Sequence, residues 1–169
     1  VPSALTLLLL LGWTVLSSPW FWSLSVIGII VVPSLLSSVL DLLRKPDNVL
    51  PRQHLASAAG SLGGRVAHDL FTLAYLPYEA FFSLDAIVRT AGRMLFTHQR
   101  LLEWNPSSES DRNSRADLAA SFRSMWTAPV IAIGAALVLA LSIPAALVVA
   151  GPILILWLIS PAIAWWISR

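Results

Sequence analysis

The chain lacks cysteine and has few charged side chains. Lys, Arg, Asp and Glu make up 12% of its 169 residues, and 57% of the residues are hydrophobic. An ordinary soluble domain is about 25% charged. The absence of cysteine excludes a disulfide framework and a thiolate metal site, and the composition excludes disorder and argues against a soluble enzyme core. The net charge of +2 gives no reason to expect a nucleic-acid partner.

The few charges are also unevenly placed. Residues 1–40 and 124–168 contain none, and 19 of the 20 charged side chains lie between Asp41 and Arg123. Two uncharged blocks around a charged middle are typical of a membrane protein. The apolar run begins almost at Val1, without the basic region or cleavage site of a signal peptide. We therefore expect the sequence to be a piece of a longer polypeptide.

The uncharged blocks predict four transmembrane helices. A bilayer core about 30 Å thick needs roughly 20 apolar residues in a helix. The candidate spans are 4–18, 20–43, 125–143 and 145–168. Short proline-containing connections join the first two and the last two, so each pair is expected to form a hairpin. The predicted fold is an all-α membrane protein with transmembrane hairpins at 1–43 and 125–169.

The basic residues predict the orientation of these spans. Lys and Arg lie in the charged middle and at the last residue, whereas neither hairpin turn is charged. Because Lys and Arg mark the cytoplasmic side, we expect residues 41–123 and both ends to be cytoplasmic, in a bacterial inner membrane. Tryptophans are expected to anchor both interfaces. The expected anchors are Trp20 and Trp22 outside, and Trp126, Trp165, Trp166 and Arg169 inside.

The charged middle is expected to comprise a linker (44–64), amphipathic helices (65–104), and a polar loop with a short helix (105–124). The alanine- and leucine-containing part of the linker could instead begin a helix. We take Pro77 as a first-turn residue of a helix that begins near Tyr78. Three- and four-residue spacing then divides this helix into two faces. The apolar stripe is Phe81, Leu84, Val88, Ala91, Leu95 and Leu102; the polar face is Glu79, Ser83, Arg89, Arg93, Thr97 and Arg100. Such a helix is expected in the cytoplasmic interface, its apolar side toward lipid or the spans.

The polar face of this helix supplies candidate docking residues. Its arginines could contact anionic headgroups or an acidic face of a cytosolic domain. Asp85 and Arg89 have the spacing of a favourable i,i+4 pair, and Trp104 is expected to be an interfacial anchor. The candidate docking residues are Tyr78, Glu79, Asp85, Arg89, Arg93, Arg100 and Trp104.

Residues that could perform catalysis or bind a metal are sparse. The spans contain no ionisable residue except Asp41, near a span end, which disfavours transport chemistry in the bilayer. We expect Asp41 to lie beside Arg44 or Lys45. The three histidines lack the spacing of a metal site, and residues 60–64 (GSLGG) lack the pattern of a nucleophile elbow. We expect no catalytic residue, cofactor or metal in this chain.

Several ordered motifs resemble one family. They are LPYEA at 76–80, LDAIVRT at 84–90, RLLEW at 100–104, Met-Trp at 125–126 and SPAIAWW at 160–166. Together they resemble the membrane region that follows the glycosyltransferase domain in bacterial cyclic β-1,2-glucan synthases. The resemblance implies an inner-membrane parent that uses UDP-glucose with a divalent metal (Mg or Mn). Other domains of the same polypeptide, a cytosolic glycosyltransferase and glucan-processing domains, are then the expected partners besides the lipid bilayer.

The catalytic signatures of that family have no counterpart in this chain. The motif nearest to its acceptor-binding Q-x-x-R-W begins at Gln99 and has Leu102 where arginine belongs. The favoured hypothesis is therefore a non-catalytic membrane-anchoring and interfacial module of such an enzyme. The alternative is a stand-alone four-helix membrane scaffold or a small-solute transporter.

Overall fold

The computed structural model describes residues 1–43, 51–97 and 118–168, and throughout these ranges the regular elements are helices, with no β-strand. This part of the chain is all-α, as the sequence predicts. The elements are α1 (Pro2–Thr14), α2 (Pro19–Leu43), α3 (Pro51–Gly92), the π-helical turn η1 (Arg93–Thr97), α5 (Leu118–Ser124), α6 (Thr127–Ser142), the 3₁₀ turn η2 (Pro144–Ala146) and α7 (Leu147–Ile167).

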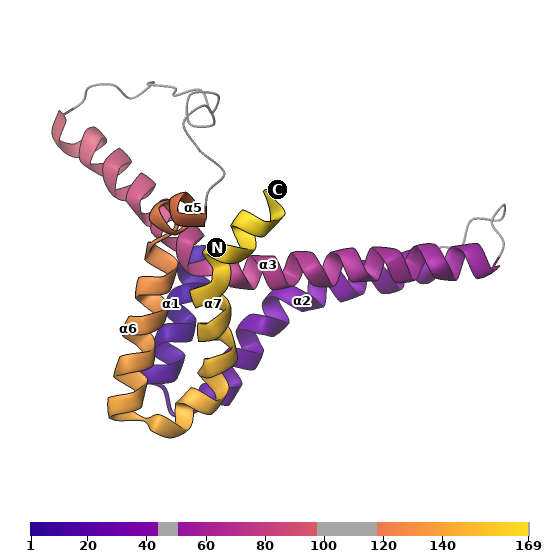
Figure 1. Ribbon diagram of the computed structural model, residues 1–169, viewed down its shortest axis with the longest axis horizontal. Coiled ribbons are helices and arrows are strands. Elements are labelled where there is room, and N and C mark those ends of the chain that lie inside the picture. The colour runs from indigo at the N-terminus through magenta and orange to yellow at the C-terminus, as the bar shows by residue number, and fades with distance from the viewer. Residues whose placement is uncertain (44–50, 98–117, 169) are drawn as a thin grey trace.

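The predicted apolar helices form two hairpins. Residues 15–18 join α1 to α2, and Ile143 with η2 joins α6 to α7. In Figure 1, α1, α6, α7 and the first part of α2 lie side by side as a bundle. Both hairpin turns lie at one end of this bundle, and both chain ends lie at the other. The pairing of the helices is therefore as predicted.

Within the described ranges, two helical segments are long and apolar enough to cross a bilayer, Pro19–Asp41 and Pro144–Ile167. Helix α1 has 13 residues and α6 has 16. At 1.5 Å per residue these helices reach about 20 and 24 Å, less than a hydrocarbon core of about 30 Å. Four transmembrane spans therefore stay a prediction.

Two tryptophans form the centre of the bundle. Trp13 of α1 and Trp157 of α7 are fully buried, with ring centroids 5.7 Å apart. The Trp13 indole N–H donates a 2.8 Å hydrogen bond to Ser23 Oγ of α2, so this buried donor has the partner that burial requires. Aliphatic side chains complete the core: Leu5, Leu9, Val26, Leu76, Ala132, Ala135, Leu139, Ala146, Ala150, Ile153 and Leu154.

Helices α1 and α2 approach closely at a glycine. A Cβ atom added to Gly12 would lie 2.5 Å from the Cβ of Trp22, a separation that two carbon atoms cannot adopt. The half-buried Trp22 therefore packs directly against the backbone of α1. Glycine at this position lets the two helices meet.

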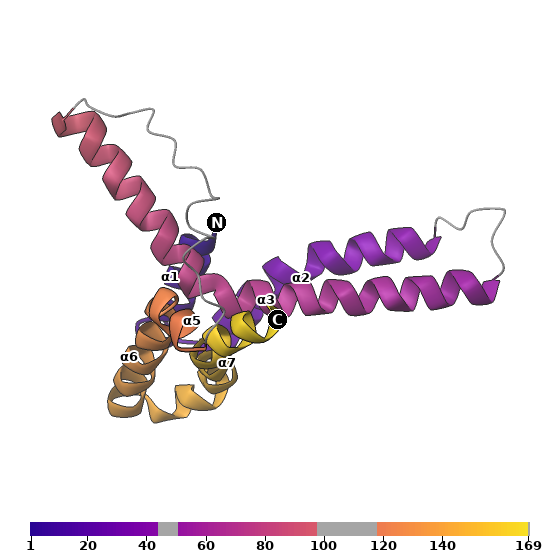
Figure 2. The same cartoon turned by 45° about the horizontal axis from the view of Figure 1, so that its top comes forward.

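Helices α2 and α3 leave the bundle together. Figures 1 and 2 show α2 changing direction along its length, so that its second part runs beside the first part of α3 across the bundle end. Pro33 lies inside α2, and an internal proline removes a helical hydrogen bond and kinks the helix. Asp41 of α2 forms an ion pair with Arg65 of α3. The expected partners of Asp41, Arg44 and Lys45, lie outside the described residues.

Helix α3 corrects two expectations. It begins at Pro51, so residues 51–64, expected as a linker whose alanine- and leucine-containing part could begin a helix, are helical throughout. It also continues through Pro77, which is therefore not the first turn of a new helix. The predicted short helix is present as α5, whereas the predicted polar loop and residues 44–50 lie outside the described ranges.

Candidate functional site at the junction of the bundle and helix α3

The LPYEA motif lies where α3 meets the bundle. Leu76 and Pro77 are almost fully buried, and Ala80 is 4% exposed. Figures 1 and 2 show α3 turning in this region: its first part lies across the bundle end and its last part rises away from it as an arm. A proline inside a helix is the expected cause of such a turn. We call the segment 73–80 the junction and residues 81–97 the arm.

Pro77 leaves one backbone carbonyl without its helical donor. A proline nitrogen carries no hydrogen, so residue 77 cannot donate to the carbonyl of residue 73, four positions earlier. The indole N–H of Trp157 donates to that Leu73 oxygen at 2.9 Å. The side chain of Trp157 is fully buried. One hydrogen bond thus satisfies both the tryptophan and the carbonyl, and it ties α7 to the turn of α3.

Helix α1 contacts the same turn through two hydroxyl groups. Thr6 Oγ1 lies 3.2 Å from the Leu76 carbonyl and 2.9 Å from the Pro2 carbonyl of its own helix, so its single hydrogen is shared. Ser3 Oγ donates to the Ala80 carbonyl at 3.4 Å. Carbonyls on both sides of Pro77 therefore receive donors from α1, and α3 is held to the bundle by two other helices.

Two tyrosines flank the turn. Partial burial raises the pKa of the Tyr75 and Tyr78 phenols above the ordinary value of 10.0. Both side chains therefore keep their proton at neutral pH. The Tyr78 ring packs on Phe82, with centroids 4.9 Å apart. The predicted docking residue Tyr78 thus belongs to the packed base of the arm.

The arm is α-helical to Gly92 and continues as the π-helical turn Arg93–Thr97, and its apolar stripe does not pack on the bundle. Exposure along the stripe runs from 41% at Phe81 to 72% at Leu95. Trp126 touches its base, with the Phe81 and Trp126 ring centroids 6.1 Å apart. For most of its described length the stripe therefore does not pack on the spans, and that alternative of the prediction is wrong. The surface that would cover the stripe is then lipid or another protein.

The other predicted docking residues that the structure describes lie at the end of the junction and along the arm. Arg89 Nε donates to Asp85 Oδ1 at 2.8 Å, which confirms the predicted i,i+4 pair. Glu79 and Arg93 are exposed, Arg93 in the π-helical turn. Arg100 and Trp104 lie outside the described residues. The structure thus shows where four of these polar groups lie and does not test what binds them.

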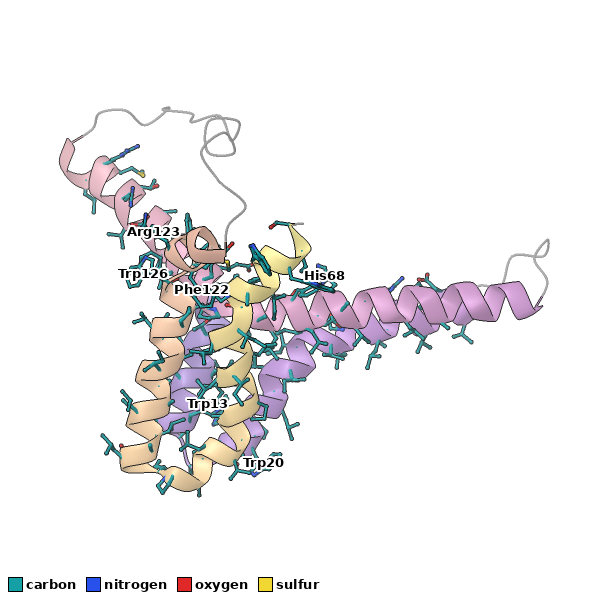
Figure 3. All side chains as sticks on the ribbon, viewed as in Figure 1. Trp13, Trp20, His68, Phe122, Arg123 and Trp126 are labelled. Carbon is teal, nitrogen blue, oxygen red and sulfur yellow. The ribbon has the colours of Figure 1, made fainter. Side chains whose placement is uncertain are left out.

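The predicted tryptophan anchors lie at both ends of the bundle. Figure 3 shows Trp20 near the hairpin turns and Trp126 at the opposite end. Both are more than half exposed, as is Trp166, whereas Trp165 is half-buried. Arg169 lies outside the described residues. Exposed tryptophans at both ends of a helical bundle are typical of a protein that crosses two membrane interfaces. The anchoring role of these residues stays a prediction.

Outside the arm, the described residues contain two close pairs of ionisable groups, Arg65 with Asp41 and His68 with Asp69. No three His, Asp or Glu side chains within the described ranges come together as a possible metal site. His68 Nδ1 lies 3.9 Å from Asp69 Oδ1, which is too far for a hydrogen bond. The arrangement of the described residues is therefore suited to holding helices in place, and we assign it no chemical step.

Sequence reasoning missed Trp157, Thr6 and Ser3 as functional residues. The available signal was Pro77 itself, since a proline inside a helix predicts an unsatisfied carbonyl at residue 73. Tryptophan carries one donor and no acceptor, so an uncharged helix with a tryptophan is a candidate source of the missing donor. The sequence does not indicate which of the eight tryptophans lies close enough.

The described residues form an all-helical fold in which two helices have the length and composition of a span and many large apolar side chains are exposed, which supports a membrane protein. No family model matches the chain. Among curated proteins it is similar to the cyclic β-(1,2)-glucan synthase NdvB of Rhizobium meliloti (strain 1021), with 26% identity over 148 residues. That alignment covers 88% of this chain and 5% of the relative. The similarity is distant and supports a relation to that family.

Proposed function

We propose that this chain is the membrane-anchoring and interfacial module of a processive inner-membrane glycosyltransferase that makes cyclic β-1,2-glucan from UDP-glucose. The name of the curated relative supports the glucan product, and the apolar helices support a membrane location. The observation that carries the anchoring role is the junction. There Trp157 and Thr6 hold the turn of α3 against the bundle.

In this proposal the bundle crosses the inner membrane four times, with α1 and α6 included. The apolar outer faces of its helices support contact with lipid, because soluble monomers rarely expose apolar patches of such extent. Three outer positions of α6, Val130, Ile133 and Leu137, are more than half exposed. The two hairpin turns face the periplasm, and α3 lies on the cytoplasmic side.

The arm then connects the membrane to a cytosolic glycosyltransferase domain of the same polypeptide. Its exposed stripe and its Asp85–Arg89 pair give it one apolar and one charged face. Because the junction holds the base of the arm, the arm has a set direction relative to the bundle. A domain bound to it is thereby kept near the bilayer. UDP-glucose and the divalent metal belong, in this proposal, to that domain and not to this chain.

Two measurements test the proposal, one on the full polypeptide and one on this chain alone. The full polypeptide, in its own membranes, should transfer glucose from radiolabelled UDP-glucose into β-1,2-glucan. This chain alone, reconstituted in vesicles with Mg²⁺, should not bind radiolabelled UDP-glucose. Saturable binding by the chain alone, or a parent polypeptide without transfer activity, would overturn the proposal. Uptake of a small solute by vesicles that contain only this chain would favour a transporter instead.

A further inference from the structure

An apolar groove lies in the angle between α2 and α3. It has a volume of about 200 Å³. Ile27, Ile30 and Val31 of α2 line one side, and Val66, Leu70 and Leu73 of α3 line the other. These spacings of one, three and four residues place each set on one face of its helix. The groove therefore lies beneath α3, beside the part of α2 that belongs to the bundle.

One ionisable residue lines this groove. The Asp69 side chain is 12% exposed. Arg65, one helical turn away, is paired with Asp41, and the His68 ring lies beyond hydrogen-bond distance. Within the described part of the chain, Asp69 thus has no Lys or Arg partner. A carboxylate on the wall of an apolar groove attracts a nearby cation, because little water lies between the two charges to screen them.

We propose that this groove binds a phospholipid with an ammonium headgroup, its acyl chain between α2 and α3 and its ammonium beside Asp69. The inference rests on the proposed membrane location. A helix has a diameter of about 10 Å, which is too wide for a groove of about 200 Å³. Part of a single hydrocarbon chain fits this space and matches its apolar walls.

The surroundings of the groove support this occupant. Leu24 and Trp20, three and seven residues before Ile27 on α2, are about 60% exposed. They extend an apolar track from the groove toward the hairpin end of the bundle. Asp69 is on α3, which lies across the other end (Figure 1). Asp69 thus lies where the lipid headgroup would bind, and the apolar track lies where the acyl chain would bind. An anionic headgroup would be repelled by Asp69.

Photocrosslinking of the full polypeptide in proteoliposomes tests the site. The probes are phosphatidylethanolamine and phosphatidylglycerol, each with a diazirine on the acyl chain, and mass spectrometry maps the labelled peptides. The ethanolamine probe should label the segments 27–31 and 66–73 about fivefold more than the glycerol probe, because one charge contact near the surface has this effect. Asp69→Asn should bring the ratio to about one. Val66→Trp should fill the groove and lower the labelling, whereas Leu62→Trp, one turn earlier and outside the groove, should not.

Three other outcomes would each overturn a part of this proposal. Equal labelling by the two probes in the native protein would overturn the headgroup assignment. Labelling of the outer face of α6 at Ile133 and Leu137 without labelling of the groove would overturn the lipid site and leave the membrane location standing. Absence of labelling at both places would overturn the membrane location as well.

Discussion

The Trp157 indole N–H donates a 2.9 Å hydrogen bond to the carbonyl of Leu73, the group that Pro77 leaves without a helical donor. A helix can therefore turn at Pro77 inside the protein without an unsatisfied carbonyl. The contact also connects α7 to α3, so the direction of the arm depends on a residue of the bundle. This link between two helices is the basis of the first prediction.

Trp157→Phe should lower the free energy of unfolding. The smaller phenyl ring can still pack on Trp13, but the Leu73 carbonyl loses its donor, which costs about 1–3 kcal/mol for a buried polar group, in addition to the cost of the space the indole leaves. The measurement is the unfolding transition in mixed detergent micelles. Pro77→Ala restores a backbone N–H for the same carbonyl. The double variant should therefore be less destabilised by Trp157→Phe than the native chain is; equal costs in both backgrounds would show that the hydrogen bond has no role.

Gly12→Ala should also destabilise the bundle. The new Cβ would overlap the Trp22 Cβ at 2.5 Å, and relief of such a clash costs about 1–3 kcal/mol. Gly28→Ala in α2 is the matched control, because no atom lies within 4 Å of a Cβ at that position. The control should be neutral or about 1 kcal/mol more stable, since alanine favours helix. The same micelle assay measures both. Similar stability of the two variants would mean that α1 and α2 do not meet at Gly12.

Val88→Asp should lower the function of the full polypeptide without lowering the stability of this chain. Val88 is 67% exposed on the apolar stripe of the arm, so the charge should change the unfolding free energy by less than about 0.5 kcal/mol. In the full polypeptide the same charge would face lipid or a protein surface, where it must be desolvated. Glucan output and membrane-assembled enzyme should therefore fall.

Thr90→Asp is the control for this prediction, because the exposed Thr90 lies seven residues after Ser83 and three before Arg93, both on the polar face. It should leave both the stability and the glucan output near the native values. Equal output from Val88→Asp and Thr90→Asp would remove the docking role assigned to the stripe.

Much of the fold could be predicted from the sequence. Apolar runs and proline-containing turns predicted the four bundle helices, because local composition decides where such helices begin and end. The ion pair of Asp85 and Arg89 could also be predicted, because its two residues are four positions apart on one helix. The path of α3 through Pro77 was not predictable in this way, because the replacement donor lies 84 residues away at Trp157. Whether a proline ends a helix depends on tertiary contacts that local patterns do not contain.

The candidate site was predicted only in part, for the same reason. Helical spacing separated the apolar stripe of the arm from its charged face. It did not show that the stripe is exposed in this chain, because exposure depends on how far the arm departs from the bundle. Nor did it place Asp41 beside Arg65, 24 residues along the chain.

The topology of the bundle is the central claim, and labelling of single cysteines measures it most directly. The chain has no cysteine of its own, so each introduced thiol is the probe in this region. In the full polypeptide, Ser18→Cys and Ala145→Cys, at the two hairpin turns, should react with a membrane-impermeant maleimide from the periplasm. Glu79→Cys, exposed on α3, should react only after the cytoplasmic side is opened. Labelling of Ser18→Cys and Ala145→Cys from opposite sides, or of Glu79→Cys from the periplasm, would contradict the account.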